Sequence, residues 1–236
     1  GAGTQAVADA VQAYFPRAGV VRWDSDTART AKEHEEVLRR FESGESRVLV
    51  GTQLVAKGLD IPEVTLVAVV SADIGLAVPD FRAAERTFQL LTQAAGRAGR
   101  GPRGGSVIFQ TFQPEHYAIR AAAREDYEAF YRAEMAVRAE FAYPPFTRLV
   151  RLVYSDPDAA EAERAARDLA ARLERERSVS GDTGNSGVGP TPPYPPRLRG
   201  RYRWQIVLRG PEPAGLLDKV PPGRGWTVDV DPASLA

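Results

Sequence analysis

The chain has 236 residues, 43% of them hydrophobic and 26% charged, which allows one large or two modest folded domains and excludes disorder throughout. Its 31 basic and 31 acidic side chains cancel, so a global positive field is excluded and any contact with nucleic acid must come from a local patch. With no cysteine and two isolated histidines, the sequence also excludes disulfides and thiolate or histidine metal sites within this stretch.

The hydropathy pattern favours a soluble protein of the cytoplasm. The sequence contains no run of about 18 or more apolar residues and no signal peptide. It begins at Gly1 without an initiator methionine. We therefore expect a part of a longer cytoplasmic protein.

The first half of the chain alternates predicted helices with short apolar segments. Thr4 is placed to cap a first helix that Pro16 ends, and Thr27 to open a charged amphipathic helix that Gly44 ends. Two later segments are apolar on both faces, which is typical of buried parallel strands. Strands separated by helices of this length predict a doubly wound α/β lobe with a parallel sheet. The predicted strands are 19–23, 47–52, 65–70 and 106–111, and the predicted helices are 4–15, 27–43 and 81–96.

The second half begins with a charged helical stretch at residues 115–140, which ends before Pro144 and Pro145 and forms a connector. Beyond it, short strands around a long Ala/Arg/Glu helix predict a small α+β domain. Residues 178–196 are rich in Gly, Ser and Pro, and a loop of that length is either mobile or functional. The expected domains are 1–113, 114–145 and 146–236; the last has strands at 147–154, 201–209 and 226–230 and helices at 158–177 and 215–219.

A strand that runs into a loop at residues 50–62 is the first candidate for chemistry. Small residues there let backbone N–H groups and the Thr52 hydroxyl approach a phosphate closely. Lys57 adds positive charge, and Asp60 can accept a hydrogen bond from a hydroxyl group or hold an arginine. A plain βα turn with a glycine cap is the alternative that this segment alone leaves open.

The second candidate lies at residues 93–101, at the end of the predicted helix 81–96. Glycines flank Arg97 and Arg100, which would share one face if the helix continued. Phosphoryl transfer develops negative charge around the γ-phosphate, and arginine supplies a rigid, permanently charged fork for it. The alternative is a basic helix end that balances the helix dipole, although such an end needs neither Gln93 nor the two glycines.

Together the two segments resemble motifs V and VI of superfamily 2 helicases, with the patterns T-x-x-x-A-[K/R]-G-x-D and Q-x-x-G-R-x-G-R in that order. The chain as a whole resembles the PriA family of replication-restart helicases, also called primosomal protein N′. The segments that carry this resemblance are Asp73, 80–86, 89–93, 203–208 and 228–232. It is weakest in the connector and at 178–196, and it implies a RecA-like second motor lobe followed by a small α+β domain.

The resemblance implies roles in the first segment by position. Thr52, Gln53 and Lys57 would contact the tracked DNA strand or couple it to the nucleotide. Gly58 and Asp60 would lie at the edge of the nucleotide.

It likewise implies that Gln93 and Arg97 sense the γ-phosphate and that Arg100 is the arginine finger. Structural support of this segment is expected from Asp73 and from an ion-pair network of three charged residues. A solvated charged helix face is the alternative for those three. They are Arg82, Glu85 and Arg86.

Two motor elements are missing from the sequence. It contains no G-x-x-x-x-G-K-[ST] P-loop and no D-E-x-H motif for Mg²⁺. In the family both lie on an N-terminal lobe, which would bind most of the ATP and Mg²⁺, and zinc sites lie just upstream of this stretch. We therefore expect no metal site here and no ATP hydrolysis by this chain alone, although the full-length protein would be an ATP-dependent 3′–5′ DNA helicase.

The segment at 201–209 alternates Tyr202, Trp204, Ile206 and Leu208 with polar residues, which puts the aromatics on one face of a strand, toward a core. Four arginines within seven residues form a local basic patch suited to phosphate contact. A solvated strand face is the alternative. The four are Arg197, Arg199, Arg201 and Arg203.

The family resemblance also implies partners. They are forked and single-stranded DNA, the acidic tail of single-stranded DNA-binding protein, and other primosome proteins, bound by a monomer associated with the nucleoid. The sequence does not divide the basic patch between DNA and the acidic tail. Two other functions stay open: a different fork-remodelling or recombination helicase, and a non-catalytic fork-binding platform that loads primosome proteins.

Overall fold

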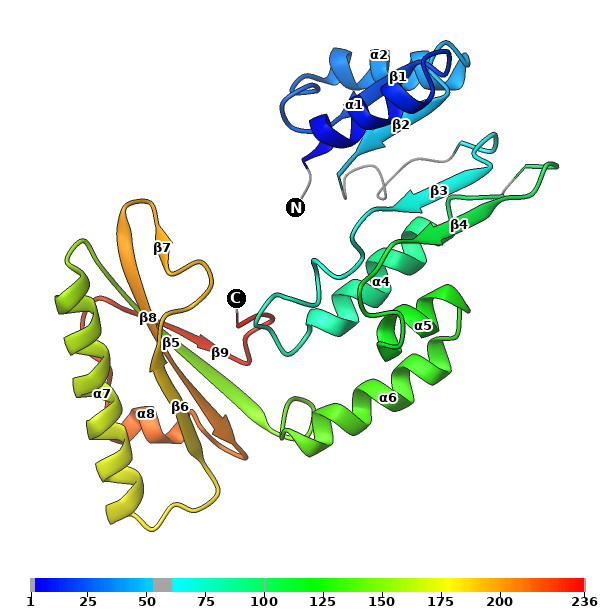
Figure 1. The fold of residues 1–236 in the computed structure, drawn as a ribbon. Coiled ribbons are helices and arrows are strands. Elements are labelled where there is room, and N and C mark those ends of the chain that lie inside the picture. The colour runs from blue at the N-terminus through cyan, green and yellow to red at the C-terminus, as the bar shows by residue number, and fades with distance from the viewer. Residues whose placement is uncertain (1–2, 53–60, 100, 236) are drawn as a thin grey trace. The chain divides into compact units, whose positions relative to one another are not determined.

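A computed structural model of the chain describes residues 3–52, 61–99 and 101–235. The chain divides into two compact units, drawn in Figure 1. The N-terminal unit is Gly1–Gly75 with Glu85–Phe130, and the C-terminal unit is Leu76–Ala84 with Tyr131–Ala236. The expected domain boundaries at residues 113 and 145 stay predictions.

The strands of the N-terminal unit are parallel, which confirms the predicted α/β class. Val20 pairs with Val48, and Leu66 pairs with Ser106. The expected continuous, fully buried sheet is not seen in the described residues, because hydrogen bonds join the strands in two separate pairs and Leu66 and Ile108 are exposed. The elements in this half of the chain are α1 (Thr4–Tyr14), β1 (Val20–Trp23), α2 (Ala31–Glu42), β2 (Val48–Gly51), β3 (Leu66–Val69), α4 (Ala83–Ala95), β4 (Ser106–Phe109), α5 (Tyr117–Ala123) and α6 (Tyr127–Glu140). The first two residues of α4 and the part of α6 after Phe130 belong to the C-terminal unit.

A buried carboxylate at the end of β1 explains why neither predicted cap is used. Thr4 donates its hydroxyl hydrogen bond to Asp24, so α1 begins after Gly3 without a side-chain cap. Thr27 Oγ1 lies 3.0 Å from the other oxygen of Asp24. The hydrogen bond from Thr4, together with that from Arg22, holds the pKa of Asp24 well below its usual range. Both threonines therefore interact with a buried carboxylate and do not cap a helix.

Helix α2 begins four residues later than predicted, at a capping box. Thr30 Oγ1 accepts a hydrogen bond from the Glu33 backbone N–H at 3.3 Å, and the Glu33 carboxylate accepts one from the Thr30 N–H at 2.8 Å. Two backbone donors at the helix start are satisfied in this way. The prediction of a start at Thr27 was wrong because the S/T-x-x-E pattern lies one threonine further along the chain.

Aromatic side chains hold α4 against α5 and α6 within the N-terminal unit. The rings of Phe88 and Phe130 stack with centroids 4.1 Å apart, and the ring of Tyr117 lies 6.0 Å from that of Phe130. Leu91, on the same helix, is fully buried. The predicted helical stretch 115–140 is broken at Glu125, which has a φ of 54°. The break lets α5 and α6 pack around Phe88.

The C-terminal unit is an antiparallel sheet in the order β6-β8-β5-β9, with β7 paired to β8. The expected loop 178–196 contains a strand, so the prediction of 19 residues without regular structure was wrong. Ser186 pairs with Arg209 and Val188 with Val207, although glycines and Pro190 interrupt the strand pattern. The elements are β5 (Arg148–Asp156), α7 (Ala159–Val179), β6 (Ser186–Thr191), β7 (Arg197–Leu198), β8 (Arg201–Gly210), α8 (Gly215–Lys219) and β9 (Trp226–Val230).

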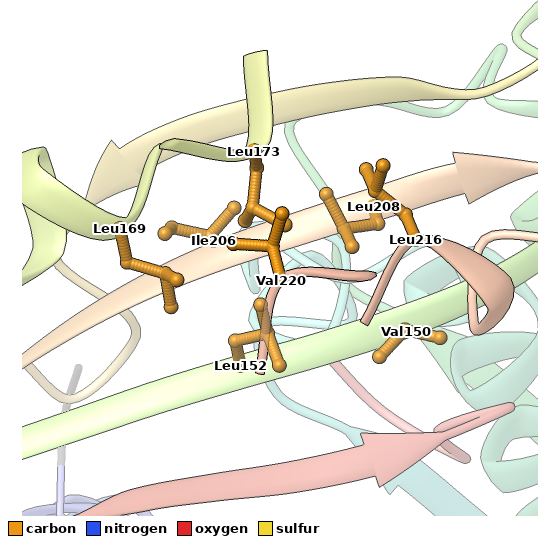
Figure 2. Close-up of a cluster of buried hydrophobic side chains, with 8 residues drawn as sticks. All are labelled: Val150, Leu152, Leu169, Leu173, Ile206, Leu208, Leu216 and Val220. Atoms are coloured by element: carbon orange, nitrogen blue, oxygen red, sulfur yellow. The ribbon is translucent and has the colours of Figure 1, made fainter. Parts of the chain in front are cut away.

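Helices α7 and α8 cover one face of this sheet, and apolar side chains fill the space between (Figures 1 and 2). Leu152 and Ile206 pair across β5 and β8 and point to that face. Leu169 and Leu173, one helical turn apart on α7, pack against them. This cluster makes the C-terminal unit a rigid base for its polar loops.

Replacing Leu152 with alanine tests this core. Because Leu152 is fully buried, we expect a loss of about 2–5 kcal/mol in the free energy of unfolding of the C-terminal unit. Urea denaturation followed by fluorescence in a Trp23→Phe background reports on this unit alone, since the remaining tryptophans are Trp204 and Trp226. Val188→Ala on the exposed part of β6 is the control and should cost less than about 1 kcal/mol. Equal losses would contradict the assigned core.

Candidate nucleotide and DNA site

Helix α4 carries Gln93 to the edge of the N-terminal unit and ends two residues later, at Ala95. Gln93 is exposed and Arg97 is half-buried. The Arg97 N–H donates to the carbonyl of Ala94 at 3.1 Å, the tighter spacing of a turn. The helix therefore ends before Arg97. Arg100 lies outside the described residues, so the shared face of the two arginines stays a prediction.

Two glycines after Arg97 make a close backbone contact possible. Gly99 has a φ of 76°, a conformation that L side chains rarely adopt. A Cβ added to Gly99 would lie 2.7 Å from the backbone nitrogen of Gly105, and one on Gly105 would lie 2.2 Å from that of Gly99. The contact at Gly99 is therefore between two stretches of backbone.

This glycine contact sets the chain beside the residues that follow the first candidate segment. The Gly99 N–H donates to the carbonyl of Val64 at 3.0 Å. A Cβ on Gly101 would lie 2.5 Å from the carbonyl oxygen of Pro62. Arg103 forms an ion pair with Glu63. Residues 61–65 thus lie beside Gly99 and residues 101–106, so the structure brings the described ends of the two candidate segments together.

Much of the first candidate segment lies outside the described residues. Thr52 is described, and it is exposed immediately after β2. The other predicted site residues of this kind are Gln53, Lys57, Gly58, Asp60 and the finger residue Arg100.

Asp73 ties the end of β3 to the end of β4. Its carboxylate accepts hydrogen bonds from Thr111 Oγ1 at 2.5 Å and from the Phe112 N–H at 2.9 Å. The bond from Thr111, followed by that from Phe112, lowers the pKa of Asp73 below its usual range. Asp73 therefore stays ionised at neutral pH and fixes two strand ends.

The other three predicted supporting residues lie on or just before α4. Arg82 and Glu85 are half-buried, and Arg86 is exposed. Glu85 Oε1 accepts a hydrogen bond from Gln89 Nε2 at 3.1 Å. The predicted ion-pair network stays a prediction.

The hairpin of β7 and β8 distributes the predicted arginine patch over two faces. Arg197 pairs with Tyr202, and its guanidinium lies 4.9 Å from the centre of that ring. Arg201 and Arg203 belong to the opposite face by the alternation of β8. Arg199 stands in the turn between the strands with a φ of 49°. The side-chain alternation predicted for 201–209 is confirmed, but it does not put all four arginines on one face.

Backbone carbonyls hold two of these arginines in place. An Nη2 hydrogen bond runs from Arg201 to the carbonyl of Ser155 at 2.7 Å, and an Nη1 bond from Arg203 to that of Pro195 at 3.1 Å. Their remaining donors can still reach a phosphate or a carboxylate, because a guanidinium carries five.

Sequence reasoning missed a buried cation on the polar face of the C-terminal sheet. Arg151 is 8% exposed and donates from Nε to Gln205 Oε1 at 3.0 Å. Burial, followed by the nearby charge of Arg203, lowers the pKa of Arg151 from its usual value. The alternation of β5 gives its face, but only the fold shows that Arg151 is buried near the charges of Arg203, Asp229 and Asp80.

Among the described residues, no group of three or more His, Asp or Glu side chains is arranged to hold a metal ion. In the same part of the chain, no helix combines the length and apolarity needed to cross a membrane.

Comparison with known proteins gives the family. The model of the helicase conserved C-terminal domain matches residues 9–102, and that of the primosomal protein N C-terminal domain matches residues 139–233. The replication restart protein PriA of Bacillus subtilis is 44% identical over 209 residues, which are 89% of this chain and 26% of that protein. The chain belongs to the PriA family of replication restart proteins.

Other members of the PriA family show the same coverage. The protein from Synechocystis is 38% identical over 242 residues, all of this chain and 29% of its own length. That from Haemophilus influenzae is 35% identical over 211 residues, 89% of this chain and 28% of its own. The chain thus spans between a quarter and a third of these relatives.

The glycine contact predicts that alanine substitutions at Gly99 and at Gly96 have different effects on hydrogen exchange. Gly99→Ala forces a left-handed residue against Gly105, at a cost of about 1–2 kcal/mol or more. Gly96→Ala is the control, because its Cβ would lie 3.5 Å from the Thr92 carbonyl, an ordinary contact. We expect amide hydrogen exchange at residues 61–65 and 99–106 to accelerate about tenfold or more in Gly99→Ala and to change little in Gly96→Ala. Equal behaviour would mean that the backbone contact does not hold these segments.

The arginines of the β7–β8 hairpin predict that DNA binding by the full-length PriA family protein depends on salt. Replacing all four by glutamine should flatten the slope of log K against log salt for duplex DNA by about 3–4 units, at roughly 0.9 per phosphate contact. The control replaces four exposed arginines of α7, which carry the same total charge, and should leave the slope within about one unit. An unchanged slope in the hairpin variant would remove these residues from the DNA surface. The residues are Arg197, Arg199, Arg201 and Arg203 in the hairpin and Arg164, Arg167, Arg172 and Arg175 in α7.

Proposed function

We propose that this chain is the C-terminal part of an ATP-dependent 3′–5′ DNA helicase that recognises stalled or branched forks and restarts replication. Family models for a helicase domain and a primosomal protein domain match it in that order, and relatives carry the name replication restart protein. The observation that carries the proposal is the backbone bond from Gly99 to Val64, which sets the end of candidate segment 93–101 beside the residues that follow candidate segment 50–62.

In this proposal the chain supplies the second half of a composite ATP site. Gln93 and Arg97 sense the γ-phosphate, and Arg100 is the arginine finger, which stabilises charge that develops during phosphoryl transfer. Gly58 and Asp60 lie at the nucleotide edge. An N-terminal lobe outside this chain holds most of the ATP and Mg²⁺, since this sequence has no P-loop.

DNA movement follows from alternating grips. Thr52, Gln53 and Lys57 contact the tracked strand. When the two lobes close on one ATP and then reopen, these residues shift along the strand relative to the contacts of the other lobe. The C-terminal unit contacts fork DNA and the acidic tail of single-stranded DNA-binding protein through the arginines of the β7–β8 hairpin. The full-length protein acts as a monomer on the nucleoid, with other primosome proteins as partners, and zinc belongs to a region outside this chain.

Arg100→Ala in the full-length protein tests the motor. We expect kcat for DNA-stimulated ATP hydrolysis to fall by roughly 10³-fold or more, because the transition-state charge loses its partner, while nucleotide still binds. Arg103→Ala is the matched control, since Arg103 lies on the same loop in a surface ion pair with Glu63. Near-normal turnover in Arg100→Ala would contradict the finger assignment. If the unsubstituted protein binds forks without hydrolysing ATP, it is a loading platform.

The isolated chain provides a second test. Without a P-loop lobe it should hydrolyse no ATP above background, with or without DNA, in a phosphate-release assay. Turnover by the purified chain would overturn the division of the ATP site between two lobes.

A further inference from the structure

The start of helix α4 is fixed by residues that belong to the C-terminal unit. Asp80 lies three residues before α4 and Oδ1 of its carboxylate accepts a hydrogen bond from the Arg82 N–H at 2.8 Å. The carbonyl of Asp80 accepts another from the Ala83 N–H at 3.0 Å, the first residue of the helix. Asp80 therefore sets where the first turn of α4 begins.

The second carboxylate oxygen of Asp80 holds a segment 154 residues away in the sequence. It accepts hydrogen bonds from the Ser234 hydroxyl and from the Leu235 N–H, the latter at 3.2 Å. The Ser234 carbonyl in turn accepts a bond from Nη1 of the buried Arg151 at 3.4 Å. We call this arrangement, made of Asp80, Ser234 and Leu235, the C-terminal clasp. An ionised carboxylate makes stronger hydrogen bonds than a neutral acceptor, so the clasp is a firm link.

The residue after Asp80 is anchored independently. The ring of Phe81 stacks on that of Tyr143 with centroids 5.7 Å apart, and the guanidinium of Arg138 lies 5.5 Å from the centre of the Phe81 ring. Arg138 donates from Nε to Glu134 at 2.7 Å, and both side chains are nearly buried. The segment before α4 is thus held at two consecutive residues by the C-terminal unit.

The other end of the same helix carries the motor residues of the proposed function. Ala83 and Ala84 lie in the C-terminal unit, whereas the rest of α4, up to Gln93, lies in the N-terminal unit. At 1.5 Å per residue, the 13 residues of α4 span about 20 Å without a break. A hydrogen-bonded helix does not stretch, so a shift at its first turn is carried to its last.

From this continuity we propose that Asp80 is a positioning residue for ATP hydrolysis. The C-terminal clasp holds the start of α4, and through the helix it sets the placement of Gln93 and of the arginine segment that follows. This inference rests on the proposed function. Reaction rates depend steeply on such placement, since a misplacement of about 1 Å can cost roughly 10²-fold. The C-terminal unit thereby tunes the motor as well as contacting partners.

The test uses the full-length protein and its DNA-stimulated ATP hydrolysis. Asp80→Ala removes the carboxylate that accepts from Arg82, Ser234 and Leu235 and should lower kcat about 10- to 100-fold, with KM for ATP changed less than about twofold, because placement and not binding is lost. The matched control is Asp158→Ala, which removes the bonds to Ala160 and Glu161 at the start of α7 in the same unit. The control should keep the wild-type kcat.

A milder variant guards against loss of folding. Ser234→Ala removes a single hydroxyl and should lower kcat a few-fold. Added to Asp80→Ala it should have no further effect, because residues of one hydrogen-bonded unit are not additive. Independent, multiplying effects of the two substitutions would overturn the clasp, as would a wild-type kcat in Asp80→Ala.

The proposed function and this inference fail in different ways. If Arg100→Ala abolishes turnover while Asp80→Ala and Ser234→Ala leave kcat unchanged, the motor assignment stands and the clasp is overturned. If the unsubstituted protein shows no DNA-stimulated turnover, the proposed function and the clasp are both overturned. A fall of kcat in both clasp variants, at constant KM and with an unaffected Asp158→Ala control, supports the clasp.

Discussion

A close contact between two stretches of backbone organises the candidate motor site. It is possible because both residues are glycines, which have no side chain. Gly99 and Gly105 approach so closely that a Cβ on either would overlap the other's backbone nitrogen. The approach lets the Gly99 N–H reach the Val64 carbonyl and sets the chain after Arg97 beside residues 61–65. An arginine that must reach a phosphate needs a loop whose path is fixed, and here the main chain itself fixes it.

Helix α4 is one of two described helices that belong to both compact units; the other is α6. Its middle is held by Phe88 and Leu91 in the aromatic and apolar core of the N-terminal unit. Its beginning is held by Asp80 and Phe81, which belong to the C-terminal unit. The unit that we propose to contact DNA and partners is thereby connected by a continuous helix to residues proposed to touch ATP. Under this proposal, binding to the C-terminal unit would have a physical route to the rate of hydrolysis.

Regular elements were predicted well where local chemistry decides them. Helix α8 and strand β9 have the predicted bounds, and the alternation around Trp204 gives the correct faces of β8, because period-2 patterning depends only on neighbouring residues. Helix starts were predicted less well, since Thr4 and Thr27 bind Asp24, a contact 20 residues away in one case. Strand β6 was missed because its glycines and Pro190 are typical of a loop. It forms a strand because it pairs with β8, which is distant in the sequence.

In the candidate site, too, local patterns could be recognised from the sequence and contacts between distant residues could not. The motif patterns around Thr52 and Arg97 name the residue types that a phosphoryl-transfer site needs, without any structure. They do not show why Gly99 is a glycine, that Arg151 is buried, or that Asp80 holds the end of the chain, because each of these depends on residues distant in sequence.

The central claim is that the arginine segment after α4 meets a triphosphate held by another lobe. The most direct measurement is a structure of the full-length protein with forked DNA and a transition-state analogue of ATP, such as ADP with a metal fluoride. We expect the Arg100 guanidinium to lie about 3 Å from the group that replaces the γ-phosphate. Arg100 paired with protein carboxylates, or turned away from the nucleotide in that complex, would contradict it.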